Sequence, residues 1–238
     1  MIRIIRYVDR IHWSLNRKNG NLVLKSTMKK PVIMHGLSIN KVGFATAVLS
    51  VIFAVGYFIP QILSAAQIIP HPQDLFWLFL PSLFLAPSFL IAMICLHYAA
   101  SASLKIWTNI AVAFAVIYCA DVSIVYFTQL TVVLPSQLKG QVDEKNVLLF
   151  DKRTFLMAVD CLGYFFMSLS TLFAAFAFRK NTWLYRGLLW NGALMPVLVL
   201  AFFYPTFYYI GALWMVTFPL AMINAAKFFV TIRKANSN

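Results

Sequence analysis

The longest apolar stretch of the chain lies between Arg186 and Lys227, where forty consecutive residues include no Lys, Arg, His, Asp or Glu. It divides near Tyr204 and Pro205 into two halves of about 20 residues, the length at which a helix crosses a hydrocarbon core of roughly 30 Å. Similar runs recur along most of the chain. Because a soluble domain has no means of covering several such runs, the pattern predicts a helical integral membrane protein.

Six spans are predicted, so the expected fold class is an all-α bundle of six transmembrane helices. They lie near residues 42–66, 75–99, 106–134, 154–178, 184–203 and 207–230. The third run is longer than a bilayer requires, but it contains no Gly or Pro that would form a turn, so we predict one tilted or protruding helix. The expected organisation is an N-terminal segment at 1–41, a transmembrane domain at 42–232 and a tail at 233–238.

The distribution of charge predicts the orientation of this bundle. The chain is 61% apolar and 11% charged, with twenty Lys and Arg against seven Asp and Glu. Sixteen of the bases fall on one side of the predicted topology and four on the other. The positive-inside rule then places both termini in the cytoplasm, and the basic excess indicates topology instead of a nucleic-acid partner. We expect a bacterial cytoplasmic (inner) membrane.

The basic segment at 1–41 has the spacing of an amphipathic helix. Two sets of residues fall on separate helical faces: Ile4, Val8, Ile11 and Leu15 on one, and Arg3, Arg10 and Arg17 on the other. Such a helix would lie on the membrane, with its arginines on anionic head groups at about 1 kcal/mol per basic residue. Two alternatives stay open, namely an organellar presequence or a true start at Met28 or Met34.

Asp121 and Asp160 are the only carboxylates inside the predicted spans. A charge at this depth costs about 2.5 to 3.5 kcal/mol, so both require an explanation. The helical rise places them at similar depths, and consecutive antiparallel spans usually pack together, so the two acids are expected to face each other. Two adjacent carboxylates in a low dielectric do not both ionise, which predicts a proton or cation relay. The alternative is that each acid only fastens helices together.

Polar residues on two spans predict the interior of the bundle. The first span carries a stripe of small and polar residues: Gly43, Ala47, Ser50, Ala54, Tyr57, Gln61 and Ser64. The fourth carries Asp160, Tyr164, Ser168, Thr171 and Ala175 on one side. Close packing alone explains such stripes, and a hydrated cavity is the alternative. The candidate ligand or relay residues are Asp121, Asp160, Gln129, Tyr118, Tyr164, Gln61 and Tyr57.

The sequence contains none of the motifs of soluble catalysis. We find no H-E-x-x-H, no G-x-S-x-G, no phosphate-binding glycine loop and no dinucleotide fingerprint. The three cysteines lack metal-type spacing. No catalytic residue, metal or cofactor is therefore assigned, and an enzyme is less expected than a binding protein. Four tryptophans suit interfacial anchoring: Trp77, Trp107, Trp183 and Trp214.

In its overall plan, and in the runs that begin at Tyr126 and Leu162, the chain resembles compact multi-span bacterial membrane proteins without an assigned role. This resemblance implies no activity, ligand or site residue. The hypothesis from the residues is binding or transport of a small solute or cation. Two alternatives stay open: an intramembrane enzyme acting on a lipid or isoprenoid, and a non-catalytic scaffold or assembly subunit. The lipid bilayer is the expected partner, and the oligomeric state is not predicted.

Overall fold

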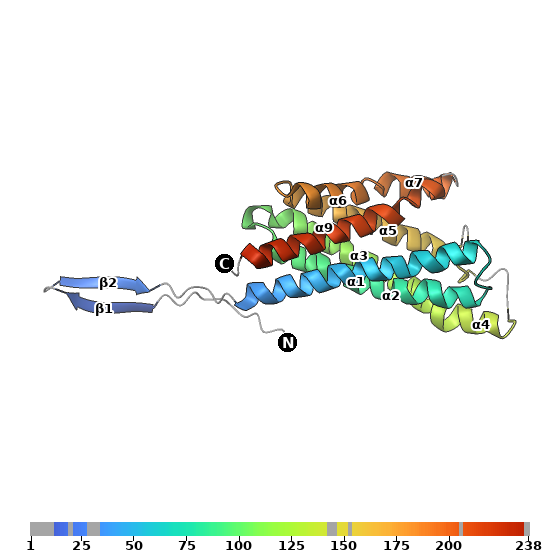
Figure 1. Cartoon of the computed structure of the whole chain (residues 1–238), viewed down its shortest axis with the longest axis horizontal. Coiled ribbons are helices and arrows are strands. Elements are labelled where there is room, and N and C mark those ends of the chain that lie inside the picture. Colours follow the sequence, from blue (N-terminus) through green and yellow to red (C-terminus); the bar gives the residue numbers. More distant parts are fainter. Residues whose placement is uncertain are drawn as a thin grey trace. The chain divides into compact units, whose positions relative to one another are not determined.

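The structure is a computed structural model of the whole chain. It describes residues 12–18, 21–27, 34–141, 147–151, 154–204 and 207–235. The chain divides into two compact units, Met1–Gly36 and Leu37–Asn238. The first is a small β-structure and the second a helical bundle (Figure 1).

The described part of the first unit is an antiparallel hairpin of β1 (His12–Lys18) and β2 (Asn21–Thr27). Lys18 pairs with Asn21 at one end and His12 with Thr27 at the other. The two residues between the strands in the sequence are Asn-Gly, the dipeptide most typical of two-residue hairpin turns.

The surface helix predicted for this segment is therefore wrong where it overlaps the strands, at Leu15 and Arg17. Its other residues, from Arg3 to Ile11, lie outside the described part of the chain. Helical spacing of a few apolar residues is a weak signal beside an Asn-Gly turn flanked by strand-length runs. Contact of this basic segment with anionic head groups stays a prediction.

Among its described residues, the second unit has five helices that are long and apolar enough to cross a membrane. Their membrane-length portions are Ile39–Ala65, Gln73–Ala99, Ala102–Leu138, Phe155–Ala177 and Trp214–Ala235. The corresponding elements are α1 (Met34–Ala65), α2 (Gln73–Ala99), α3 (Lys105–Thr128) with its extensions, α5 (Phe155–Ala177) and α9 (Trp214–Ala235). These helices fit a multi-pass membrane bundle, as the apolar runs predicted.

The long third run is one helix, as its lack of Gly and Pro predicted. A short 3-10 turn, η1 (Ala102–Leu104), leads into α3, which continues through a π-helical segment, η2 (Gln129–Val133), into α4 (Leu134–Leu138). Pro135 stands in the first turn of α4, where its missing N–H does not interrupt the helix.

The expected fifth span is interrupted. It consists of α6 (Thr182–Gly192) and α7 (Met195–Phe203), separated by a turn at 193–194 just before Pro196. Pro196 lacks the N–H that would continue the hydrogen-bond ladder of α6, and Gly192 is the last residue of that helix. The proline alone does not explain the break, because Pro60, Pro87 and Pro219 lie inside continuous helices. Neither piece alone has membrane length, so the described chain has five helices of membrane length where six spans were predicted, and the count of six crossings is not confirmed.

The expected sixth span is also divided. A short helix, α8 (Phe207–Gly211), is separated by 212–213 from α9, which begins at Trp214, seven residues later than the predicted span. Gly211 and Ala212, at this break, line a cavity together with residues of α1 and α5.

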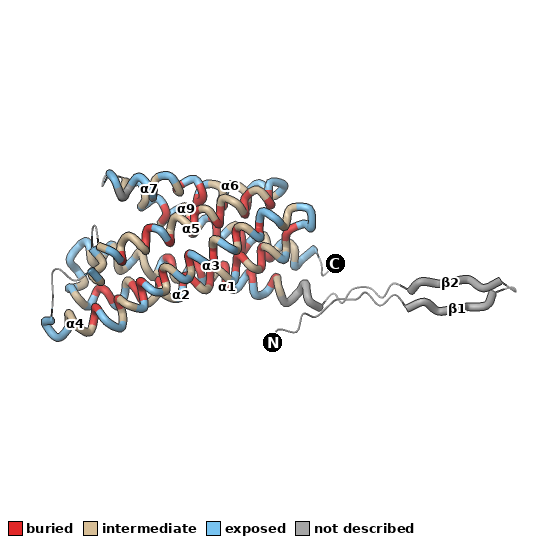
Figure 2. The backbone as a smooth tube through the Cα atoms, turned by 180° about the vertical axis from the view of Figure 1, so that it is seen from behind, coloured by how far each residue is buried: buried red, intermediate tan, exposed pale blue. Residues whose placement is uncertain are grey.

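The buried core lies between α2, α3, α5, α6 and α9 (Figure 2). Helices α3 and α5 pack closely, and a Cβ on Gly163 would lie 2.7 Å from Val122. The Ser170 hydroxyl of α5 donates a 2.7 Å hydrogen bond to the Ala111 carbonyl of α3. The antiparallel neighbours expected from the third and fourth runs are thus packed together.

Helix α1 turns its small residues inwards, as its stripe predicted. Ala47, Ser50 and Ala54 are all 0% exposed. A Cβ on Gly43 would meet the ring of Phe229 in α9, and one on Gly56 would lie 3.2 Å from Pro81 in α2. Because glycine has no side chain, it lets these neighbours come close to the α1 backbone.

Candidate functional site

A cavity of about 240 Å³ lies in the half of the bundle where α5 begins and α1 ends. Residues of α1, α5, and the α8–α9 junction line it: Tyr57, Gln61, Met157, Asp160, Cys161, Tyr164, Gly211, Ala212, Trp214 and Met215. Four of the seven candidates from the sequence, Tyr57, Gln61, Asp160 and Tyr164, thus share one cavity. They come from helices about 100 residues apart in the chain.

Asp160 is the carboxyl of this cavity. Thr154 caps α5 by accepting a hydrogen bond from the Met157 amide, and Asp160 follows in the second turn, about 8 Å from the helix start at 1.5 Å per residue. Asp160 is only 6% exposed, and its Oδ1 has no hydrogen-bond partner among the described residues. An unpaired buried carboxyl oxygen lowers the stability of the folded protein. Helix packing alone therefore does not explain why an aspartate stands here.

Tyrosine side chains surround this carboxyl. Tyr57, Tyr118, Tyr126 and Tyr164 all interact with it electrostatically, and the Tyr126 hydroxyl lies within hydrogen-bonding reach. The Tyr126 and Tyr164 hydroxyls are 3.0 Å apart and hydrogen-bonded. Tyr118 is 0% exposed, and its hydroxyl has no partner in the described chain.

Trp214 closes the cavity at the first residue of α9. Its ring stands edge-on to the ring of Tyr164, with centroids 4.8 Å apart at 81°, and to that of Tyr57, 6.2 Å apart at 78°. Trp214 is 6% exposed, whereas Trp77 and Trp183 are 54% and 71% exposed. The prediction of interfacial anchoring therefore suits those two and is wrong for Trp214.

Asp121 lies apart from this cavity. It is half-buried on α3, where its Cβ faces Gly163 of α5, and it is not among the lining residues. The structure gives no contact between Asp121 and Asp160 in the parts of α3 and α5 that it describes. The relay of two facing acids therefore stays a prediction without a contact that supports it.

Gln129 has a local structural role. It is 0% exposed within the π-helical segment, and its Nε2 donates a 2.6 Å hydrogen bond to the carbonyl of Leu148 in the following loop. The side chain thus fastens that loop to the helix end. It does not line the cavity.

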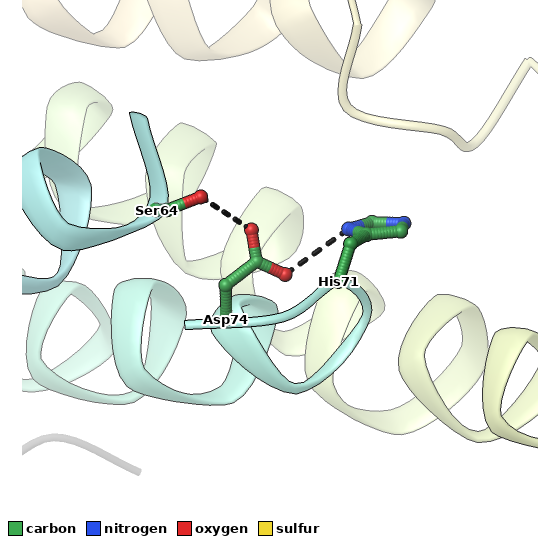
Figure 3. A network of polar contacts seen from close by, with 3 residues as sticks. All are labelled: Ser64, His71 and Asp74. Atoms are coloured by element: carbon green, nitrogen blue, oxygen red, sulfur yellow. Dashed lines mark hydrogen bonds and ion pairs between the residues drawn. The ribbon is translucent and has the colours of Figure 1, made fainter. Parts of the chain in front are cut away.

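Asp74 is a third carboxyl in the bundle, which the predicted spans missed because the second began one residue later. Its Oδ2 accepts a 2.6 Å hydrogen bond from the Ser64 hydroxyl, and its Oδ1 lies 3.0 Å from His71 Nδ1 (Figure 3). In a Ser-His-Asp catalytic triad the histidine stands between the other two, whereas here the aspartate does. The network joins the end of α1 to the first turn of α2, where a carboxylate also suits the helix dipole.

A second polar cluster on α5 is formed by Thr171, Asn191 and Thr217. Asn191 Nδ2 donates to Thr171 Oγ1, and Thr217 Oγ1 donates to Asn191 Oδ1, each at 3.1 Å. Thr171 Oγ1 in turn donates to the Ser168 carbonyl at 3.0 Å. Every side-chain polar atom of these three residues is paired, so the cluster fastens α5, α6 and α9.

Comparison with known proteins adds no relative. No family model matches the chain, and neither a curated protein nor a solved structure matches it significantly. Among the described residues no group of three or more His, Cys, Asp or Glu side chains could hold a metal ion. The arguments for a function therefore come from the cavity itself.

Proposed function

We propose that this multi-pass membrane protein binds a small polar solute or cation in the cavity at Asp160 and moves it across the membrane. One observation carries the proposal: a carboxyl that is 6% exposed lines a cavity and keeps Oδ1 unpaired within the described chain. A buried unsatisfied acceptor costs about 1 to 3 kcal/mol, and away from the cavity the same is true of Gln129 Oε1 and Asp121 Oδ2 in the described chain. An unpaired oxygen at a cavity wall is instead available to a ligand.

The size of the cavity supports a small organic solute. Its volume is about 240 Å³, whereas an engineered protein cavity of roughly 150 Å³ admits benzene. The cavity is smaller than the range of roughly 300 to 1,000 Å³ typical of drug-sized ligands. A solute of a few carbon atoms fits these bounds.

The topology proposed for this function has six crossings and both termini in the cytoplasm. Support for the sixth crossing comes from α6 and α7, whose 11 and 9 residues give about 30 Å of helix at 1.5 Å per residue. Support for the orientation comes from exposed bases at the end of the bundle where α1 begins, among them Lys41, Arg179 and Lys180. The cavity would then lie in the half of the bundle away from the cytoplasm.

Acid–base catalysis on a lipid has less support at this site. It would use two carboxyls as acid and base, and the cavity has one, because Asp121 is not among its lining residues. Asp160 alone suits binding better than two-group catalysis. Thermal unfolding of the Asp160 variant also tests the alternative of a non-catalytic scaffold.

The test is thermal unfolding of the protein in nanodiscs with a panel of small solutes. The panel contains choline, methylammonium, betaine, acetate, glycerol, sodium and potassium. At 100 times its dissociation constant, a ligand stabilises the folded state by about 2.7 kcal/mol. At least one solute is expected to raise the unfolding midpoint of the wild type. Asp160→Asn should remove this shift, and the same solute should enter proteoliposomes made with the wild type only.

Asp121→Asn is the matched control, because it changes a carboxyl of the same bundle that does not line the cavity. It should keep the ligand-induced shift. If no solute stabilises the wild type, or if Asp160→Asn keeps the full shift, the binding function is refuted. A large loss of stability in Asp160→Asn without any ligand effect would favour the scaffold.

A further inference from the structure

We infer that the solute of the Asp160 cavity is a small organic ammonium ion, an inference that rests on the binding function proposed above. The geometry that points to it is an aromatic cage, the rings of Tyr57, Tyr164 and Trp214, on the same cavity wall as a buried carboxyl. Such cages with one acidic group recognise positive charge on nitrogen, whether quaternary or protonated.

Trp214 is the ring that the other two contact. Its plane makes angles of 78° with that of Tyr57 and 81° with that of Tyr164, and both contacts are edge-to-face. The face of an aromatic ring attracts a cation, tryptophan most strongly, so a wall of these three rings suits a positive charge. Trp214 is also held by Phe58, at 5.2 Å and 88°, and by Phe218, at 5.3 Å, so the cage is preformed.

The charge of the cavity favours a cation. No described residue forms an ion pair with Asp160, and no Lys, Arg or His is among the lining residues. A carboxylate at this depth is stable only when it is paired or protonated. A bound cation would supply the missing partner, whereas an anionic solute would meet the carboxyl without any compensating base.

The donor set favours an organic cation over a metal ion. Two residues of the wall have an oxygen without a hydrogen-bond partner in the described chain, Asp160 Oδ1 and Gln61 Oε1. Hard metal cations take about six oxygen ligands in a close shell, and the rest of the wall is largely aromatic and aliphatic. An ammonium ion with N–H groups could donate to both oxygens while its carbon atoms contact the rings.

The first test compares choline with 3,3-dimethylbutan-1-ol, a neutral molecule of nearly the same shape. Choline or methylammonium should raise the unfolding midpoint of the wild type at concentrations at least tenfold lower than the neutral isostere requires. Asp160→Asn should abolish this preference, and Asp160→Glu should restore part of it. Trp214→Leu should weaken binding of the ammonium ions at least tenfold, whereas Trp183→Leu, at an exposed position, should not.

Cys161 supplies a second readout, because its thiol lines the same cavity. In a Cys95→Ala, Cys119→Ala background it is the sole cysteine. We compare its rates with a trimethylammonium and a sulfonate methanethiosulfonate reagent, each divided by its rate with free cysteine. The cationic reagent should be preferred at least tenfold, choline should slow it, and Asp160→Asn should bring the normalised ratio close to one.

The outcomes distinguish the binding of a solute from the preference of the cavity for an ammonium ion. If neutral or anionic solutes stabilise the protein as well as choline does, or if the reagents show no preference for positive charge, the ammonium ion is refuted while solute binding stands. If no solute stabilises the protein and neither reagent reaches Cys161, both are refuted. If sodium or potassium alone stabilises the protein, the site is a metal-cation site and the ammonium inference is wrong.

Discussion

Helix α5 carries two buried polar clusters that look alike in sequence and differ in structure. Asp160 and Thr171 are eleven residues apart, about 16 Å along the axis and on nearly the same face. In the cluster of Thr171, Asn191 and Thr217 every side-chain polar atom is paired, and the neighbouring Ser168 Oγ is unpaired in the described chain. Around Asp160, in the described chain, four polar atoms are unpaired: Gln61 Oε1, Tyr118 OH, Asp160 Oδ1 and Trp214 Nε1. The two clusters thus differ in how completely their polar atoms are hydrogen-bonded.

The difference follows from how closely the neighbouring helices approach. Beside Thr171, α6 is docked onto α5 through Gly192, whose added Cβ would lie 2.6 Å from Leu172. Beside Asp160 the neighbours are the ends of α1 and the interrupted α8–α9 junction, and a cavity results.

Gly192→Ala should break the docking of α6 and with it the paired cluster. The new methyl group would lie within 2.6 to 2.8 Å of Leu172 Cβ, Cα and N, and the backbone atoms cannot move aside locally. We expect a loss of about 1 to 3 kcal/mol in stability, seen as a lower thermal unfolding midpoint in nanodiscs. Gly56→Ala, where the nearest atom lies at 3.2 Å, is the control and should lose less. Equal midpoints for the two variants would contradict the close docking.

Asn191→Leu should weaken the paired cluster without changing the backbone. The substitution removes both hydrogen bonds of the amide and leaves the Thr217 hydroxyl without its acceptor. Hydrogen bonds between membrane helices are worth about 0.6 to 1.7 kcal/mol each, so a loss of roughly 1 to 2 kcal/mol is expected. The same unfolding assay checks it. Choline binding at the distant cavity should persist, and its loss would show that the two clusters are not independent.

Asp160→Leu should not lower the stability of the protein, in contrast to Asn191→Leu. The aspartate has an unpaired buried oxygen, so its replacement by an apolar side chain removes a desolvation cost and should leave stability unchanged or raise it by about 1 kcal/mol. Ligand-induced stabilisation should disappear at the same time. A loss comparable to that of Asn191→Leu would instead mark Asp160 as a fastening residue.

The smallest effect is expected from two tyrosines of α3 that are almost fully buried. Tyr126→Phe removes a hydroxyl bonded to Tyr164 at 3.0 Å, whereas Tyr118→Phe removes one without a partner in the described chain. Tyr126→Phe should lose about 0.5 to 1 kcal/mol, and Tyr118→Phe should be neutral or slightly stabilising. Unfolding midpoints of the two variants, measured side by side, decide this. The reverse order would mean that the Tyr118 hydroxyl is paired in the membrane.

Most of the helix positions could be predicted from the sequence, and the exceptions have physical causes. Long apolar runs specify helices because backbone polar groups in a membrane must be satisfied within the segment, and four predicted spans match α1, α2, α3 with its extensions, and α5 closely. The breaks before Pro196 and Trp214 were missed because apolar residues continue through them. The hairpin was missed because helical spacing was preferred to the Asn-Gly turn.

The candidate site was predicted in part. Asp160, Tyr164, Tyr57 and Gln61 were chosen as polar residues on inward stripes, and all four line the cavity. The pairing of Asp160 with Asp121 is a prediction from similar depth and from the packing of consecutive spans. Neither specifies on which side of its helix a residue lies. Trp214 was read as an interfacial anchor because sequence position does not reveal that α1 and α5 cover it.

The apolar runs alone predict a multi-pass helical membrane protein with carboxyls at unusual depth, because the match between apolar length and bilayer thickness is a local property of the chain. Which polar side chains share a cavity, and which of their atoms stay unpaired, depends on the packing of the helices. That outcome depends on how closely α1, α5 and α9 approach one another. Their approach is set by contacts between residues more than a hundred positions apart, such as Tyr57 and Trp214.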